Sequence, residues 1–223
     1  MRKLLPGLLA LAAAAGFSVW AYPQLPAQVA THFNLQGEPN GWSSRLMAVA
    51  LVPAIGLVMA LAFTFLPRID PKKANYEKFG PTWWTIANAG LVLLALIHVV
   101  MLGKALGWPI NMSRIVGLSV GGLFILIGNL MTRMRPNWFM GIRTPWTLSS
   151  DTVWRKTHRF GGIAFVIAGV CIAATGVLES RWALYAAIGM AIVAGLGSVV
   201  YSYVVWKGEQ AGQGGEGSRA AGK

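Results

Sequence analysis

The sequence predicts an all-α polytopic membrane protein, a bundle of six transmembrane helices with both termini in the cytoplasm. The 223-residue chain is 55% hydrophobic and only 12% charged, and its mean hydropathy is +0.56. Six stretches are long and apolar enough to cross a bilayer, and most basic residues lie on one side of them. This composition excludes a disordered chain, and the single cysteine excludes a disulfide-stapled secreted fold.

Each predicted span lacks Asp, Glu, Lys and Arg and approaches the roughly 20 helical residues that a bilayer core requires. The spans are Leu4–Tyr22, Leu46–Leu66, Thr82–Gly103, Ile115–Thr132, Phe160–Leu178 and Trp182–Trp206. The first also resembles a secretory signal peptide, because Arg2 and Lys3 precede an Ala-rich stretch that ends near a usable cleavage site. Its long hydrophobic run favours a retained helix.

The distribution of basic residues orients the bundle. With the N-terminus in the cytoplasm, 15 of the 19 Lys and Arg residues lie on the cytoplasmic side, as the positive-inside rule requires. Arg45, Lys104, Arg114 and Arg181 are the four on the other side. The net charge of +12 is then an orientation signal and a counter-charge to anionic lipid, and we expect no direct contact with nucleic acid.

The spans divide the chain into three parts. Residues 1–66 form an N-terminal helical hairpin with an outward loop, 23–45, and residues 67–206 form a four-helix region with a cytoplasmic loop, 133–159. Residues 207–223 are rich in Gly and polar residues, and we expect this tail to be disordered.

The outward loop contains candidate ligand-facing residues. These are His32, Asn34, Glu38, Asn40 and Trp42. Glu-Pro-Asn-Gly at 38–41 is typical of a turn, and Ser43 or Ser44 is suited to cap the second span. His32 and Glu38 could bind a cation or sense pH, but two ligands are too few for a zinc site, so we predict a structured turn with no metal and no cofactor.

The cytoplasmic loop contains a second set of candidates, which we expect to face a partner. They are Asn137, Gly141, Arg143, Thr144, Pro145, Trp146, Ser149, Trp154 and His158. A Ser at 149 or 150 followed by Asp151 predicts an interfacial helix that leads into the fifth span, with Trp154 and His158 on one face. Arg143 is suited to contact a carboxylate of the partner or a backbone carbonyl of the chain itself. The alternative is a loop of basic and aromatic lipid anchors.

Two motifs carry a resemblance to a known family. The run from Gly128-Asn129 through Arg-Pro-Asn-Trp-Phe-Met-Gly-Ile-Arg-Thr-Pro-Trp-Thr-Leu-Ser-Ser to Val-Trp-Arg-Lys-Thr-His-Arg-Phe-Gly-Gly resembles the signature of bacterial SdpI-like membrane proteins. Thr-His-Phe-Asn-Leu-Gln-Gly-Glu-Pro-Asn-Gly-Trp-Ser-Ser, at 31–44, resembles the N-terminal domain of unknown function found in that family. The resemblance implies a bacterial cytoplasmic-membrane immunity and sensor protein, which meets a secreted peptide toxin or envelope stress outside and recruits a cytoplasmic repressor inside.

Two other classes of protein compete with this interpretation. A coupled transporter usually places an ionisable group in the membrane, and the spans offer only His98, which is better suited to an interhelical hydrogen bond. An enzyme would have to be built on His158, Arg143 and Asp151. No nucleophile and base motif, H-E-x-x-H or phosphate loop accompanies these residues in the sequence, so we expect no catalytic activity.

Overall fold

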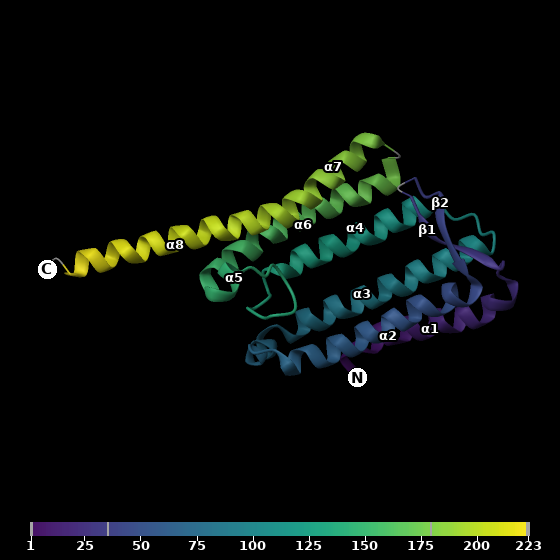
Figure 1. Ribbon diagram of the computed structural model, residues 1–223, viewed down its shortest axis with the longest axis horizontal. Coiled ribbons are helices and arrows are strands. Elements are labelled where there is room, and N and C mark those ends of the chain that lie inside the picture. Colours follow the sequence, from purple (N-terminus) through teal and green to yellow (C-terminus); the bar gives the residue numbers. More distant parts are fainter. Residues whose placement is uncertain (1, 35, 179, 222–223) are drawn as a thin grey trace.

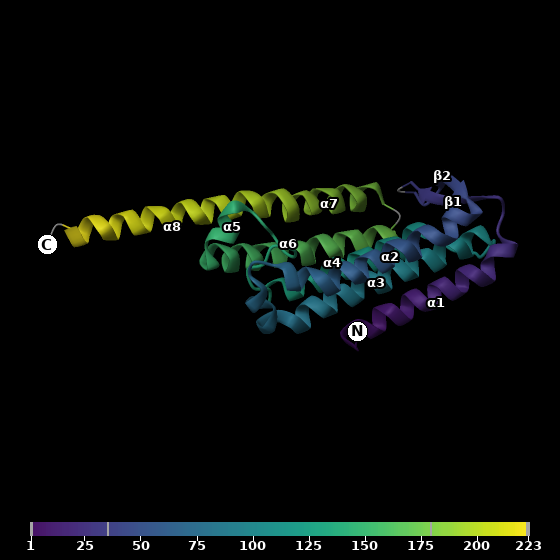
Figure 2. The ribbon, with the colours of Figure 1, turned by 60° about the horizontal axis from the view of Figure 1, so that its bottom comes forward.

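The computed structural model describes residues 2–34, 36–178 and 180–221 and confirms a helical membrane bundle (Figures 1 and 2). Six helical segments are long and apolar enough to cross a membrane, and they coincide with the six predicted spans. The long helices are α1 (Leu5–Ala21), α2 (Arg45–Ile69), α3 (Tyr76–Ala105), α4 (Met112–Met131), α6 (Asp151–Leu178), α7 (Arg181–Ile192) and α8 (Ser198–Ala221). A π-helical turn, Val193–Gly197, joins α7 to α8, so these two helices together make the sixth span.

The bundle consists of two packed groups. Helices α1, α2 and α3 form one group, and α4, α6, α7 and α8 form the other, with α3 lying beside α4 (Figure 1). Asn88 of α3 joins the first group by polar contacts, because its Oδ1 accepts from Gly7 N–H at 2.8 Å and its Nδ2 donates to Lys3 O at 2.8 Å. The Oγ of Ser18 and the Nε2 of His98 lie 2.6 Å apart. His98 is therefore the interhelical hydrogen-bonding residue that the sequence predicted.

Small residues allow α4 and α6 to pack closely. A Cβ atom added at Gly128 would lie 2.6 Å from Gly162 O, and one added at Gly169 would lie 2.7 Å from Gly121 O. Gly117 faces Gly176 in the same way. In a bilayer, where apolar surface gains little from burial against another helix, such close backbone packing is a main source of association.

The outward loop contains two short strands, which the sequence did not predict. Strands β1 (Gln28–Phe33) and β2 (Pro39–Ser44) form an antiparallel hairpin at one end of the bundle (Figure 1). The predicted turn at 38–41 is wrong, since Pro39 and the residues after it belong to β2. The chain reverses earlier, where Asn34 Oδ1 accepts from Glu38 N–H at 2.9 Å and Gly37 has a φ of +79°. Ser44 caps α2 as predicted, accepting from Met47 N–H at 3.3 Å.

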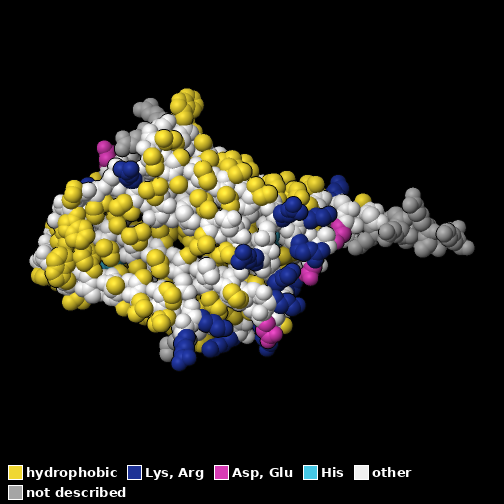
Figure 3. Space-filling model, turned by 180° about the vertical axis from the view of Figure 1, so that it is seen from behind, with side chains coloured by type: hydrophobic (Ala, Val, Ile, Leu, Met, Phe, Trp, Pro, Cys, Tyr) yellow, Lys and Arg dark blue, Asp and Glu magenta, His cyan; other side chains and the backbone are white. Residues whose placement is uncertain are grey.

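The two ends of the molecule differ in their content of basic residues. The end opposite the hairpin contains the α2–α3 connection and the segment between α4 and α6, which includes the short helix α5 (Pro145–Ser149) (Figure 1). Most of the Lys and Arg side chains seen in Figure 3 gather toward this end, whereas the rest of that face shows mainly hydrophobic and uncharged atoms with a few charged side chains. We call it the inward end, because the basic asymmetry of the sequence predicts that it faces the cytoplasm.

The C-terminal segment differs from expectation. Helix α8 continues through Lys207 to Ala221, and its last turns project away from the bundle, where the composition predicted disorder (Figure 1). A helix that is already formed extends more readily than a new helix nucleates, so the preceding turns of α8 favour this continuation. Residues 222 and 223 of the predicted tail lie outside the described residues.

Candidate functional site

The hairpin carries the five outward candidates and pairs four of them. His32 Nδ1 and Asn40 Oδ1 make a short hydrogen bond across the strands, and Asn34 Nδ2 donates to Glu38 Oε2 at 3.1 Å. Trp42 is 59% exposed. Four of the five side chains thus pair with each other at the surface, and the hairpin is anchored beneath them by the buried Val29 and its neighbours in the bundle.

A large cavity lies below the hairpin. Its volume is about 880 Å³, and residues of the hairpin, α3, α4, α6 and α7 line it. Polar groups of Thr31, His32 and Asn34 contribute to the hairpin side. The helices contribute an apolar wall that includes Ile97, Val116, Val120, Ile172, Leu184 and Ile188. The cavity is therefore amphipathic, with polar groups at one end and apolar side chains within the predicted membrane region.

The inward segment is shaped by buried polar side chains. Asn137 has none of its surface exposed, and its Oδ1 accepts from Phe139 N–H at 2.9 Å and Met140 N–H at 2.7 Å. Its Nδ2 donates to the carbonyls of Arg135 and Met140, each at 2.9 Å. All four hydrogen bonds of this amide fix the turn in which it lies, so Asn137 holds the segment's shape.

His158 joins this segment to α6. Its Nδ1 lies 2.9 Å from Trp154 O, and its Nε2 accepts from Ile142 N–H at 3.1 Å. A carbonyl cannot donate and a backbone N–H cannot accept, so this geometry requires a neutral imidazole with its proton on Nδ1. The ring also stacks on Trp154 with centroids 3.9 Å apart, which confirms the predicted shared face.

Gly141 makes this contact possible. Its φ is +105°, a conformation that side-chain-bearing residues rarely adopt, and a Cβ atom there would clash with His158 Nε2. Beyond it, Thr144 begins α5 with a capping box, accepting from Thr147 N–H at 3.1 Å, and its Oγ1 lies 3.1 Å from Ser202 Oγ of α8. Ser150 Oγ accepts from Val153 N–H at 3.2 Å and so starts α6, as the sequence predicted.

Asp70 is an important residue that the sequence analysis missed. It is 2% exposed, and its Oδ2 accepts from Tyr76 Oη at 2.8 Å and from Trp138 N–H at 2.9 Å, while Oδ1 accepts from Lys72 N–H at 2.7 Å. It thereby ties the α2–α3 connection to the inward segment. The signal was an Asp in the turn that follows the second span, because an Asp side chain commonly bonds the backbone N–H two residues later, here that of Lys72.

The predicted partner-facing residues divide into two sets. Asn137, Thr144, Trp154 and His158 are buried, so they do not form an outer surface. The exposed or half-exposed members are Gly141, Arg143, Pro145, Trp146 and Ser149. Arg143 Nη1 donates to Trp138 O, so of the two predicted contacts this guanidinium makes the one to a backbone carbonyl of the chain itself. We call the exposed or half-exposed members the inward surface. Buried hydrogen bonds of Asn137, Thr144 and His158 fix the backbone that carries it.

The residues of the enzyme alternative are not brought together as a catalytic group. Both nitrogens of His158 are engaged with the backbone, Arg143 contacts Trp138, and Asp151 lies exposed at the start of α6. Within the part of the chain that the structure describes, no three His, Cys, Asp or Glu side chains gather as metal ligands.

The apolar helices and the polar segments at the two ends define a multi-pass membrane protein. Residues 133–202 match the SdpI/YfhL protein family, and residues 9–57 match a domain of unknown function, DUF1648. The chain is 28% identical over 190 residues to the immunity protein SdpI of Bacillus subtilis strain 168, and the match covers 85% of this chain and 89% of that protein. No solved structure matches. The chain is therefore a multi-pass bacterial membrane protein that is similar to SdpI, as its two motifs indicated.

Proposed function

We propose that this chain is a membrane immunity protein that gives resistance to a secreted antimicrobial peptide or to a related envelope stress. The similarity to a protein named for immunity extends over most of both chains. The observation that carries the proposal is the cavity of about 880 Å³ below the hairpin. A membrane-active peptide is amphipathic, and this cavity offers polar groups near His32 and apolar side chains farther in.

Survival of bacteria that express the chain and are challenged with a panel of membrane-active peptides tests the proposal. Val120→Phe fills the cavity from α4 and should reduce protection, whereas Leu118→Phe adds bulk to an exposed position of that helix and should not. Alanine at His32, Glu38 or Trp42 should also weaken protection at unchanged membrane abundance. Full protection by Val120→Phe and by all three alanine variants would exclude recognition at this end.

We propose further that the inward surface recruits a cytoplasmic regulator. The support is its construction: exposed Arg143, Pro145 and Ser149 project from a backbone fixed by buried hydrogen bonds, whereas lipid anchoring needs little order. A photo-crosslinking residue at Ser149 should capture a protein that the same residue at exposed Thr132 does not, and challenge with peptide should change the yield. Equal products at both positions, with and without challenge, would contradict recruitment.

Arg143→Lys tests the shape of this surface. The substitution keeps the charge but loses the planar guanidinium, so a surface that acts only by charge should be unaffected. A shaped surface should lose on the order of tenfold in recruitment, because a charge-assisted hydrogen bond contributes about 1.5–3 kcal/mol. Crosslinking yield at Ser149, normalised to membrane abundance, measures the difference.

A further inference from the structure

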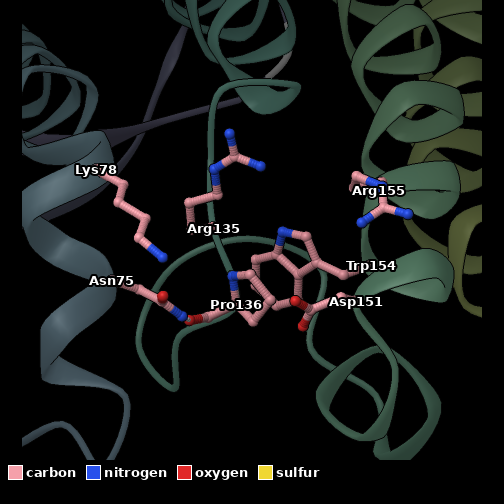
Figure 4. Close-up of a pocket in the computed structure, with 7 residues that line it drawn as sticks. All are labelled: Asn75, Lys78, Arg135, Pro136, Asp151, Trp154 and Arg155. Carbon is pink, nitrogen blue, oxygen red and sulfur yellow. Dashed lines mark hydrogen bonds between the residues drawn. The ribbon is translucent and has the colours of Figure 1, made fainter.

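We propose that a second cavity, at the inward end, binds a phosphate group. This cavity has a volume of about 260 Å³ and lies between the start of α3, the chain just after α4 and the start of α6 (Figure 4). Its lining residues are Asn75, Lys78, Arg135, Pro136, Asp151, Trp154 and Arg155. A water molecule occupies about 30 Å³ in the liquid, so the space admits a phosphate group with part of its hydration shell.

The lining is positively charged. Lys78, Arg135 and Arg155 bring three cations from three separate parts of the chain, against the one carboxylate of Asp151 (Figure 4). Among the described residues, the side chains of Lys78 and Arg135 make no hydrogen bond or ion pair. Arg155 donates only to Thr152 Oγ1, at 3.2 Å. The site therefore has cationic donors that the protein itself does not neutralise.

The backbone that carries Arg135 is held on both sides. Asn75 Nδ2 donates to Pro136 O at 2.7 Å, and Trp154 Nε1 donates to Met134 O at 3.1 Å. Trp154 is fully buried and forms one wall of the cavity. Because these bonds bracket Arg135, its Cα position is fixed before any ligand arrives, which lowers the entropy cost of binding.

This chemistry favours phosphate. The planar guanidinium of Arg135 or Arg155 matches two phosphate oxygens. Lys78 adds a point charge from the α3 side, across the cavity from Arg155 (Figure 4). The phosphate could belong to an anionic lipid headgroup or to a soluble phosphate compound. The site is independent of the peptide-binding cavity, which lies at the other end of the bundle.

Calorimetric titration of the purified full chain in a non-ionic detergent tests the proposal. The probes are inorganic phosphate, glycerol 3-phosphate and dihexanoylphosphatidylglycerol, with dihexanoylphosphatidylcholine as the zwitterionic comparison. Arg135→Gln and Lys78→Gln should each weaken binding about tenfold, since each removes a charge-assisted contact. Arg133→Gln is the matched control, because it removes the same charge two residues away and outside the cavity lining. Asp151→Asn should tighten binding by removing the one anion.

The outcomes distinguish a lipid headgroup from a soluble phosphate compound, and a specific site from diffuse charge attraction. Saturable binding of phosphatidylglycerol alone assigns the site to a lipid headgroup, and binding of the soluble probes as well assigns it to a free phosphate compound. Equal loss in Arg133→Gln and Arg135→Gln would show diffuse charge attraction and overturn the site. Absence of saturable binding to every probe would also overturn it.

Discussion

The two ends of the bundle use polar side chains in opposite ways. On the hairpin, His32 pairs with Asn40 and Asn34 pairs with Glu38 at the surface. At the inward end, Asp70, Asn137 and His158 are buried and bond to backbone groups. An exposed pair exchanges its partners for water at little cost, whereas a buried backbone group that loses its partner stays unsatisfied. The hairpin side chains are thus suited to recognition, and the inward side chains determine the fold of their segment.

Cysteine labelling tests which end of the bundle faces the outside of the cell. Single cysteines at exposed Gln36 and exposed Lys73, in a Cys171→Ala background, should differ completely in labelling of intact cells by an impermeant thiol reagent. The basic asymmetry predicts labelling at position 36 and none at position 73. The reverse pattern would exchange the outward and inward ends.

The largest loss of stability should follow Asp70→Ala. The substitution leaves the Lys72 and Trp138 N–H groups and the Tyr76 hydroxyl without their acceptor. We expect the free energy of unfolding to fall by about 3 kcal/mol, since three part-buried donors lose a charged acceptor and each lost hydrogen bond costs about 1 kcal/mol or more. Denaturation by sodium dodecyl sulfate from mixed micelles measures it. Asp151→Ala, an exposed carboxylate at the same end, is the control, and an equal effect of both would refute the special role of Asp70.

A smaller loss should follow Gly141→Ala. The added Cβ meets His158 Nε2, and a side-chain-bearing residue at positive φ costs about 1–2 kcal/mol before that clash is counted. We expect a fall of about 2–3 kcal/mol by the same denaturation. Gly122→Ala, in α4 with open space around it, should be neutral or stabilising. Similar midpoints for the two variants would show that the Gly141 contact is not required.

The smallest effect should be that of His32→Ala. The side chain is exposed and its hydrogen bond to Asn40 is accessible to water, so we expect a change in unfolding free energy below about 1 kcal/mol. Thermal unfolding in detergent, followed by circular dichroism, checks it. A loss as large as that of Gly141→Ala would remove the contrast between the two ends.

The sequence predicted the membrane architecture because charge is expensive in hydrocarbon, so uninterrupted apolar runs as long as Leu46–Leu66 are typical of transmembrane helices. It did not predict the hairpin. Pro39 and Gly41 are uncommon within strands, and the Asn-Gly pair at 40–41 resembles a turn while Asn34 and Gly37 make the real one. The sequence also did not predict the burial of Asp70, since a charged residue in a basic loop is normally solvated. Burial is favourable here because three donors bond the carboxylate, and one of them, Trp138 N–H, lies 68 residues away in the sequence.

The close packing of α4 against α6 has a mechanical consequence. Gly117, Gly121 and Gly128 bring the two backbones into close contact along α4, so we expect the two helices to move as one unit. The 20 residues of α4 span about 30 Å, from the cavity below the hairpin to the inward segment. If a ligand moved the outer end of this pair away from α3, we expect the inner end to move with it, together with the segment that joins α4 to α6. Spin labels at the outer and inner ends of α4 should then shift together relative to α1, and movement at one end alone would show that the pair bends.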